Sequence, residues 1–262
     1  MATLKFEVKG ELGNITLRGF LDTVESAFKI LLDYDKAISG EPKGSTDWVI
    51  TNVSTGSLCI ETEPRSRIEN KNYGPKVASS FIKGWSEIRK GVTPAYLSSQ
   101  GMRKAKKLAK IVGREGMNGL ILSGPENQRV EITPDVSKSI GQLLKVKHRS
   151  IGSVEGKLMT ISIQGGSRFV LYHSRTGKAV NCNIPIEKLA SMVKIEMLGR
   201  KVIASGIVQS NIKGEPLEVD AENIRIIRRK EELPSIESIS GSDPHFTGEM
   251  STEEFMRSVR GD

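Results

Sequence analysis

The sequence has few aromatic residues and only two cysteines, and each shortage excludes a class of protein. Phe, Trp and Tyr make up 5% of the 262 residues, so any core must be mainly aliphatic. Two cysteines exclude a disulfide-dense scaffold. Two cysteines would be enough for one disulfide bond, but we expect Cys59 and Cys182, which lie in different predicted strands, to be reduced and buried.

The chain also has no long apolar run. No stretch approaches the roughly 18 consecutive apolar residues of a membrane span, and the first ten residues, MATLKFEVKG, contain no apolar run of signal-peptide length. We therefore expect a cytoplasmic protein of bacterial type, with no membrane as partner.

Catalytic and metal-binding motifs are missing as well. His148, His173 and His245 form no i, i+4 pair and have no Cys or Asp cluster beside them in the sequence, which argues against zinc and di-iron sites. The sequence contains neither a Gly-x-Ser-x-Gly elbow nor a phosphate-binding Gly-rich loop. A catalytic triad whose members are far apart in the sequence is not excluded by these motif searches. Our prediction is a protein that is not an enzyme and has no cofactor and no metal.

What the chain does have is a globular composition with a basic bias. It is 37% apolar and 27% charged, which excludes a fully disordered chain. The net charge of +8 is compatible with a polyanionic partner. The length predicts more than one domain.

Residues 1–147 are predicted to form an α+β domain. The strand pattern is clearest in residues 4–8, where apolar and charged residues alternate. We expect residues 15–17 to pair back on that strand across the Gly13-Asn14 turn. The remaining predicted elements are, in order, a helix at 21–38, strands at 48–50 and 58–61, helices starting at Pro75 and spanning 100–112, a strand pair at 120–122 and 130–132, and a helix at 134–144.

One predicted helix carries five cations in the run from Arg103 to Lys110. Because Leu108 and the next apolar residues supply a buried stripe, the cations should cover a solvated face. A contact with a phosphate backbone is the alternative.

Residues 150–230 are predicted to form a small all-β barrel. The expected strands are 154–163, 168–173, 179–184, 201–208 and 217–227, with a helix at 186–197 after the third. Gly156 and Gly206, each inside a strand, allow sharp bends. This βββ-α-ββ order resembles an OB-fold barrel, and the stretch GRKVIASGIVQSNIKGEPLEVDAENIRII is similar to the closing half of such domains.

The resemblance implies that DNA or RNA would bind across the second and third strands. Residues 151–230 contain thirteen basic and seven acidic residues. Either Phe169, Leu171 and His173 or Val170 and Tyr172 must fill the barrel, so the aromatic platform is small. A protein-binding or purely structural barrel remains the alternative. The candidate nucleic-acid-binding residues are Arg168, Tyr172, His173, Arg175, Lys178, Asn181, Asn183 and Lys213.

Residues 231–262 read as a flexible acidic linker followed by a short helix. They hold eight acidic and two basic residues. Ser251-Thr252-Glu253-Glu254 is a capping box that should start the helix. Because so short a helix is marginal alone in water, we expect either the basic barrel or a partner protein to hold it. A disordered solubilising tail is the other reading.

The last twenty residues, DPHFTGEMSTEEFMRSVRGD, resemble the C-terminal segments of bacterial antitoxins paired with PIN-domain ribonuclease toxins. The chain departs from the common antitoxins, which are short and carry a DNA-binding head, because two larger domains come first. The resemblance implies a partner-binding helix in which Arg257 or Arg260 reaches a carboxylate cluster. Its implied apolar anchors are Phe246, Met250, Phe255 and Met256.

Two functional hypotheses follow. The first is a non-catalytic, antitoxin-like bacterial protein that neutralises a protein partner through its C-terminal segment. The alternative is an OB-fold nucleic-acid-binding protein.

Overall fold

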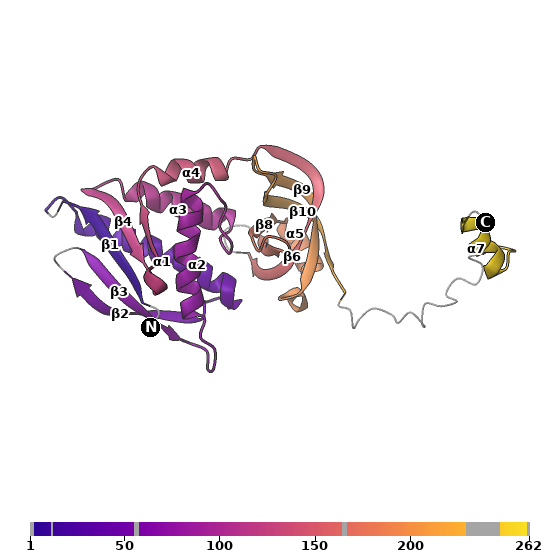
Figure 1. Cartoon of the computed structure of the whole chain (residues 1–262), viewed down its shortest axis with the longest axis horizontal. Helices are drawn as coiled ribbons and strands as arrows, with labels where there is room; N and C mark the ends of the chain where they lie inside the picture. The colour runs from indigo at the N-terminus through magenta and orange to yellow at the C-terminus, as the bar shows by residue number, and fades with distance from the viewer. Residues whose placement is uncertain (1–2, 12, 55–57, 164–166, 229–246, 261–262) are drawn as a thin grey trace. The chain divides into compact units, whose positions relative to one another are not determined.

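A computed structural model describes residues 3–11, 13–54, 58–163, 167–228 and 247–260. The chain divides into two compact units, residues 1–226 and 227–262, which are treated separately below. In the described part the protein combines helices with two five-stranded sheets, as the predicted mixture of helix and strand requires (Figure 1).

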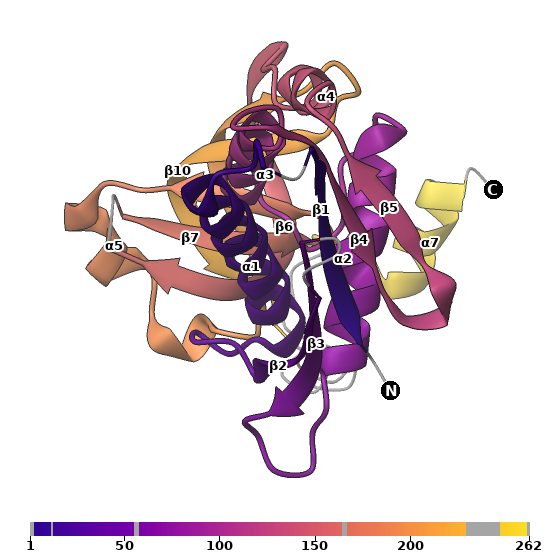
Figure 2. The same ribbon diagram turned by 90° about the vertical axis from the view of Figure 1, so that its left-hand side faces the viewer.

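The first sheet and its helices form what we call the N-terminal lobe, residues 3–144. Its strands lie in the order β2-β3-β1-β4-β5, and every neighbouring pair is antiparallel (Figure 2). The elements are β1 (Leu4–Gly10), α1 (Leu17–Ser39), β2 (Thr46–Ser54), β3 (Cys59–Ser66), α2 (Gly74–Arg89), α3 (Ser99–Ile111), β4 (Met117–Ser123), a 3-10 turn η1 (Pro125–Asn127), β5 (Arg129–Ile132) and α4 (Val136–Leu143).

The core of the lobe lies between the sheet and its helices. Leu4, Phe6 and Val8 alternate inward along β1, as the sequence pattern predicted. Phe6 stacks on Phe28 of α1 and also contacts Phe81 of α2, so both helices cover the same face of the sheet.

The predicted strand at residues 15–17 is wrong. Thr16 is the N-cap of α1, with an extended backbone and a side-chain oxygen that accepts a hydrogen bond from the Gly19 N–H at 3.0 Å. Leu17 is therefore the first helical residue. The neighbours of β1 are β3 and β4 instead.

The second sheet forms a ring around a separate core. Its strands follow the order β10-β8-β7-β6-β9, and β10 also pairs with β9. The β8–β10 pair is parallel and short, spanning Asn181–Asn183 and Glu218–Asp220, so the ring is closed unevenly. Its elements are β6 (His148–Ser162), β7 (Arg168–His173), β8 (Ala179–Asn183), α5 (Ile186–Met192), a 3-10 turn η2 (Ile195–Met197), β9 (Lys201–Ser210) and β10 (Pro216–Ile226).

The structure shows which side chains of β7 point into the core of the barrel. Phe169 and Leu171 are fully buried, whereas Val170 and Tyr172 lie on the outer face. At Gly156 and Gly206 the neighbouring backbone comes so close that an added Cβ would lie 2.5 Å and 2.1 Å from a carbonyl oxygen. Mid-strand glycine is therefore required at both positions.

In the barrel, two predicted elements differ most from the structure. Strand β6 starts at His148, not near residue 154, and pairs with β9 from its first residue. The predicted helix at 186–197 is split into α5 and η2. The lobe and the barrel have separate apolar clusters but belong to one compact unit, so a domain boundary at residues 147–150 stays a prediction.

Candidate functional site

The outer face of β7 and β8 is where the sequence placed a nucleic-acid surface, and it contacts the N-terminal lobe. The ring of Tyr172 lies 6.1 Å from that of Tyr96, in the loop before α3. Asn181 is 4% exposed, and its Nδ2 donates to the Ser99 Oγ at 2.9 Å. The Ser99 hydroxyl in turn donates to Glu218 Oε1 at 2.9 Å. These candidate side chains therefore join the two halves of the unit.

A second group of contacts surrounds Glu215, just before β10. Lys178 forms an ion pair with Oε1, and Oε2 accepts hydrogen bonds from Thr93 at 2.8 Å and Asn211 at 3.0 Å. Burial raises the pKa of Glu215, but hydrogen bonds from Lys178, Thr93 and Asn211 outweigh it and leave that pKa below its usual value. Nearby, Lys213 Nζ donates to the Gly91 carbonyl at 2.6 Å. Lys213 thus contacts the lobe directly, and Lys178 pairs with Glu215, which accepts a hydrogen bond from Thr93 of the lobe.

One cation of the predicted basic helix, α3, takes part in the same contact. Arg103 Nη2 lies 2.7 Å from Glu218 Oε1 on the barrel. Lys104 bonds to both carboxylate oxygens of Asp33 on α1 at 2.7 Å. Lys107 and Lys110 are exposed, as a solvated face requires. The first turns of α3 therefore face protein, and its later cations face solvent.

The other predicted barrel residues are more accessible. The ring Nδ1 of His173 lies 3.0 Å from the Thr176 hydroxyl, and burial, followed by the charge of Arg175, lowers the His173 pKa. Arg175 is exposed. Asn183 is exposed and donates to Asp220 at 3.2 Å. None of these three lines the pocket described next.

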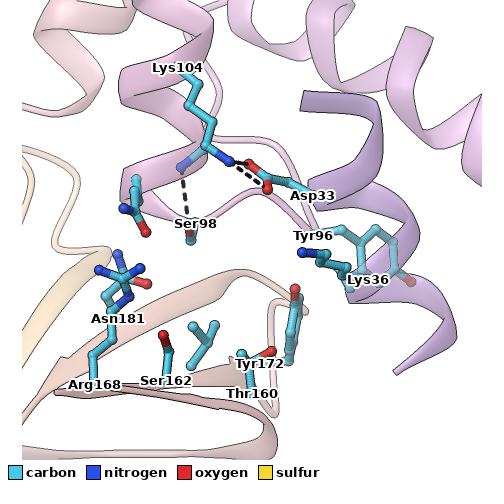
Figure 3. A pocket seen from close by; sticks show the side chains of 14 residues that line it. Asp33, Lys36, Tyr96, Ser98, Lys104, Thr160, Ser162, Arg168, Tyr172 and Asn181 are labelled. Carbon is cyan, nitrogen blue, oxygen red and sulfur yellow. Dashed lines mark hydrogen bonds and ion pairs between the residues drawn. The ribbon is translucent and has the colours of Figure 1, made fainter. Parts of the chain in front are cut away.

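Between the lobe and the barrel lies a pocket of about 280 Å³, which we call the inter-lobe pocket (Figure 3). Three of the predicted residues line it, namely Arg168, Tyr172 and Asn181. The full lining comprises Asp33, Lys36 and Ala37 from α1; Tyr96, Ser98, Gln100, Gly101 and Lys104 from α3 and the loop before it; Thr160 and Ser162 from β6; Arg168, Val170 and Tyr172 from β7; and Asn181 from β8.

The lobe side of this pocket is shaped by local backbone geometry. Ser98 is the N-cap of α3, and its Oγ accepts from the Gly101 N–H at 3.2 Å. Tyr96 has φ 63°, in the left-handed region that few non-glycine residues occupy. Such strain persists only where surrounding contacts hold it, and here the Tyr96 ring contacts Tyr172. Burial raises the pKa of Tyr172, so its phenol is neutral.

Sequence reasoning missed the lobe side of the pocket. Asp33 and Lys36 looked like ordinary polar positions of an amphipathic helix, and Tyr96 like a loop residue. The one usable signal was the Ser98 cap, which placed the start of α3 correctly. Nothing in the local pattern indicated that this helix end meets the barrel.

The C-terminal unit contains the predicted short helix as α7 (Thr252–Arg260). The capping box is formed, because the Ser251 N–H donates to Glu254 Oε2 at 2.9 Å and the Glu254 N–H donates to the Ser251 Oγ at 3.3 Å. The backbone hydrogen bond from Ser251 lowers the Glu254 pKa.

The predicted anchors lie mainly at the surface of this unit. Met250 and Met256 are 46% and 42% exposed, Phe255 is half-buried, and Val259, which the sequence reading did not select as an anchor, is 66% exposed. The predicted charged residues Arg257 and Arg260 are both exposed in the last turn. The predicted anchor Phe246 lies outside the described residues.

Comparisons with known proteins give no family: no family model matches the sequence, and no curated protein matches it. Within the described ranges, no three His, Cys, Asp or Glu side chains come together as a metal site would require. Over the same residues, every helix is too short or too polar to cross a bilayer.

Proposed function

We propose that this is a non-catalytic, cytoplasmic bacterial binding protein that holds a protein partner through its C-terminal segment. The observation that carries the proposal is α7. It is a capped helix that presents Met256 and Val259 to solvent one turn apart, with no fully buried residue along its length.

A helix of this size needs a partner surface to be stable. Nine residues are below the length at which isolated helices persist in water, and a capping box adds only about 1 kcal/mol. An apolar groove would bury Met256 and Val259, whereas Arg257 and Arg260 would reach its acidic rim. A ribonuclease of the PIN type, whose active site is a carboxylate cluster, fits this chemistry, and the function would then be that of an antitoxin.

The test is copurification of the full chain with the product of the adjacent reading frame. We expect M256D/V259D, and a chain ending at residue 243, to lose the partner, while thermal unfolding of residues 1–226 is unchanged. Ser258→Glu is the matched control, because it adds a negative charge on the face of α7 away from Met256 and Val259 and glutamate favours the helix. A partner that M256D/V259D retains as well as the parent chain does would refute the proposal.

We further propose that the barrel is an OB-fold. The support is the ring order first-second-third-fifth-fourth strand, the parallel pairing of the third and fifth strands, and the helix between the third and fourth. For the alternative function, nucleic-acid binding, the favourable observation is that Arg168 and Arg175 have no ion-pair partner among the described residues.

The contacts of the lobe limit that alternative. Tyr172, Lys178, Asn181 and Lys213 already bind the lobe or the cluster around Glu215, so a strand crossing this face would have to displace them. If the alternative holds, single-stranded oligonucleotides bind with an affinity that falls steeply with salt, and R168A/R175A weakens it. No binding at low salt would exclude it.

A further inference from the structure

We propose that the inter-lobe pocket binds a nucleotide, meaning a single nucleoside monophosphate or diphosphate. This site is separate from the C-terminal segment and does not depend on its function. The charge, the hydrogen-bonding groups, the aromatic wall and the size of the pocket each restrict what it can hold.

The charge of the pocket favours an anion. Lys36, Lys104 and Arg168 line it together with a single carboxylate, Asp33. Asp33 forms an ion pair with Lys104. Within the described ranges no carboxylate lies at ion-pair distance from Lys36 or Arg168. Figure 3 shows the Lys36 amine directed toward the pocket from one side and the Arg168 guanidinium from the other. Two cations are thus available for a phosphate group.

The start of α3 adds to this positive field. Ser98, Gln100 and Gly101, at the N-terminal end of the helix, line the pocket. A helix N-terminus carries a partial positive charge and favours bound phosphate. The helix end therefore reinforces the side-chain cations.

Asn181 favours a ligand that also donates a hydrogen bond. The Ser99 hydroxyl has one proton and donates it to Glu218, so Ser99 can only accept from the Asn181 Nδ2. This fixes the orientation of the amide. Asn181 Oδ1 is then buried and has no partner among the described residues, although Asn181 lines the pocket. A buried acceptor of this kind calls for a donor, which a bare phosphate dianion lacks and a base amine or ribose hydroxyl supplies.

The aromatic wall and the volume indicate the size of the ligand. Tyr96 and Tyr172 provide flat apolar surface on which a base can stack. The volume of about 280 Å³ is at the small end of ligand pockets. Contacts with the lobe occupy the barrel surface around it at Lys213, which donates to Gly91, and at Glu215, which accepts from Thr93. One nucleotide fits in this pocket, whereas an oligonucleotide would also need the part of the barrel surface that the lobe covers.

The experiment is calorimetric titration of the full chain with AMP, ADP, GMP and GDP, with adenosine and inorganic phosphate as partial ligands. We expect at least one nucleotide to bind, and to bind at least about tenfold more tightly than adenosine or phosphate, because only it uses both the cations and the acceptor. Arg168→Ala should weaken this binding by about tenfold or more. Arg225→Ala is the matched control, since Arg225 is exposed on β10 and does not line the pocket.

Asn181 supplies the second variant. Asn181→Asp puts a negative charge beside the phosphate site, so it should also weaken binding; far-UV circular dichroism and the melting temperature show whether this variant is folded. No binding of any of the four nucleotides at millimolar concentration would overturn the proposal, as would an unchanged affinity of Arg168→Ala. Phosphate binding as tightly as the nucleotides, or an oligonucleotide binding more tightly in an Arg168-dependent way, would assign the pocket to another ligand and also overturn it.

Discussion

Replacing Glu215 by Gln tests whether the polar cluster between the lobe and the barrel stabilises the fold. The Lys178 and Glu215 side chains are only 16% and 24% exposed, so their ion pair is weakly screened. In the variant one amide oxygen can still accept from Thr93 and Asn211, but the amide nitrogen then faces the Lys178 ammonium, and two donors oppose each other.

The expected cost follows from these contacts. Leaving one partner of a mostly buried pair without its counter-charge costs about 3–5 kcal/mol, and the retained hydrogen bonds reduce this to about 2–4 kcal/mol. For a unit of this size each kcal/mol corresponds to about 2–4 °C, so the melting temperature should fall by about 4–16 °C. Differential scanning calorimetry of the full chain measures both quantities.

Two further variants make the test specific. Glu196→Gln breaks the Lys194–Glu196 pair, whose side chains are 65% and 67% exposed, and should change stability by less than about 0.5 kcal/mol. In a double-mutant cycle, Lys178→Met should recover more than about 1 kcal/mol of the loss in the Glu215→Gln background. An effect of Glu215→Gln no larger than that of Glu196→Gln would refute the reasoning.

The same cluster predicts a dependence on pH. Because the folded-state pKa of Glu215 lies below the reference value of 4.5, its charged form contributes stability above that pH. The contribution is lost as pH falls through the lower, folded-state pKa. The stability difference between the parent chain and Glu215→Gln should therefore be full at pH 7 and should shrink below about pH 4.5.

Two other predictions concern the cores. Asp35 is fully buried near the end of α1 and accepts hydrogen bonds from the N–H groups of Ser45 and Thr46 at 2.8 and 2.9 Å and from the Ser45 hydroxyl at 2.6 Å. Because Asp35→Ala leaves these three donors without an acceptor, it should lower the free energy of unfolding in urea by about 3–5 kcal/mol. A loss under about 1 kcal/mol would contradict this. Gly206 has φ 157°, and a Cβ there would lie 2.1 Å from the Asp220 carbonyl, so Gly206→Ala should separate β9 from β10 and cost at least about 2 kcal/mol. Gly152→Ala, where the new Cβ meets only Val208 at 3.5 Å, is its control, and equal melting temperatures for the two variants would count against the close approach.

The order of the elements in both halves could be predicted because their boundaries are local. Ser98 at the start of α3 and Gly40 after α1 carry chemistry that acts within one helical turn. The Gly40 N–H closes α1 on the Lys36 carbonyl, with the glycine at φ 81°. The strand predicted at residues 15–17 was wrong because the local sequence there was ambiguous. Thr16 is a competent N-cap, but short apolar stretches do not distinguish a strand from the entry to a helix.

The site could be predicted only on its barrel side. Arg168, Tyr172 and Asn181 were chosen as polar or aromatic residues of the two strands across which OB-folds bind oligonucleotides, and they do line a pocket. Their partners are more than 70 residues away in the sequence, as the bonds from Asn181 to Ser99 and from Ser99 to Glu218 show. Amphipathic periodicity reports which face of a helix is buried, but not which element covers its end.

Those long-range contacts also explain why the barrel cannot bind a nucleic-acid strand on the outer face of β7 and β8 and a nucleotide in the inter-lobe pocket at the same time. The lobe contacts the barrel at Tyr172, Asn181 and Lys213, which removes an open path for a polymer across the outer face of β7 and β8. The same docking brings Lys36 opposite Arg168. Because the single proton of Ser99 goes to Glu218, it also leaves Asn181 Oδ1 as an acceptor without a partner in the part of the chain that the structure describes. Strengthening or weakening the contact between the lobe and the barrel should therefore change nucleotide affinity in the same direction. Oligonucleotide affinity, if it exists, should change in the opposite direction, because a strand gains access only when the lobe moves away.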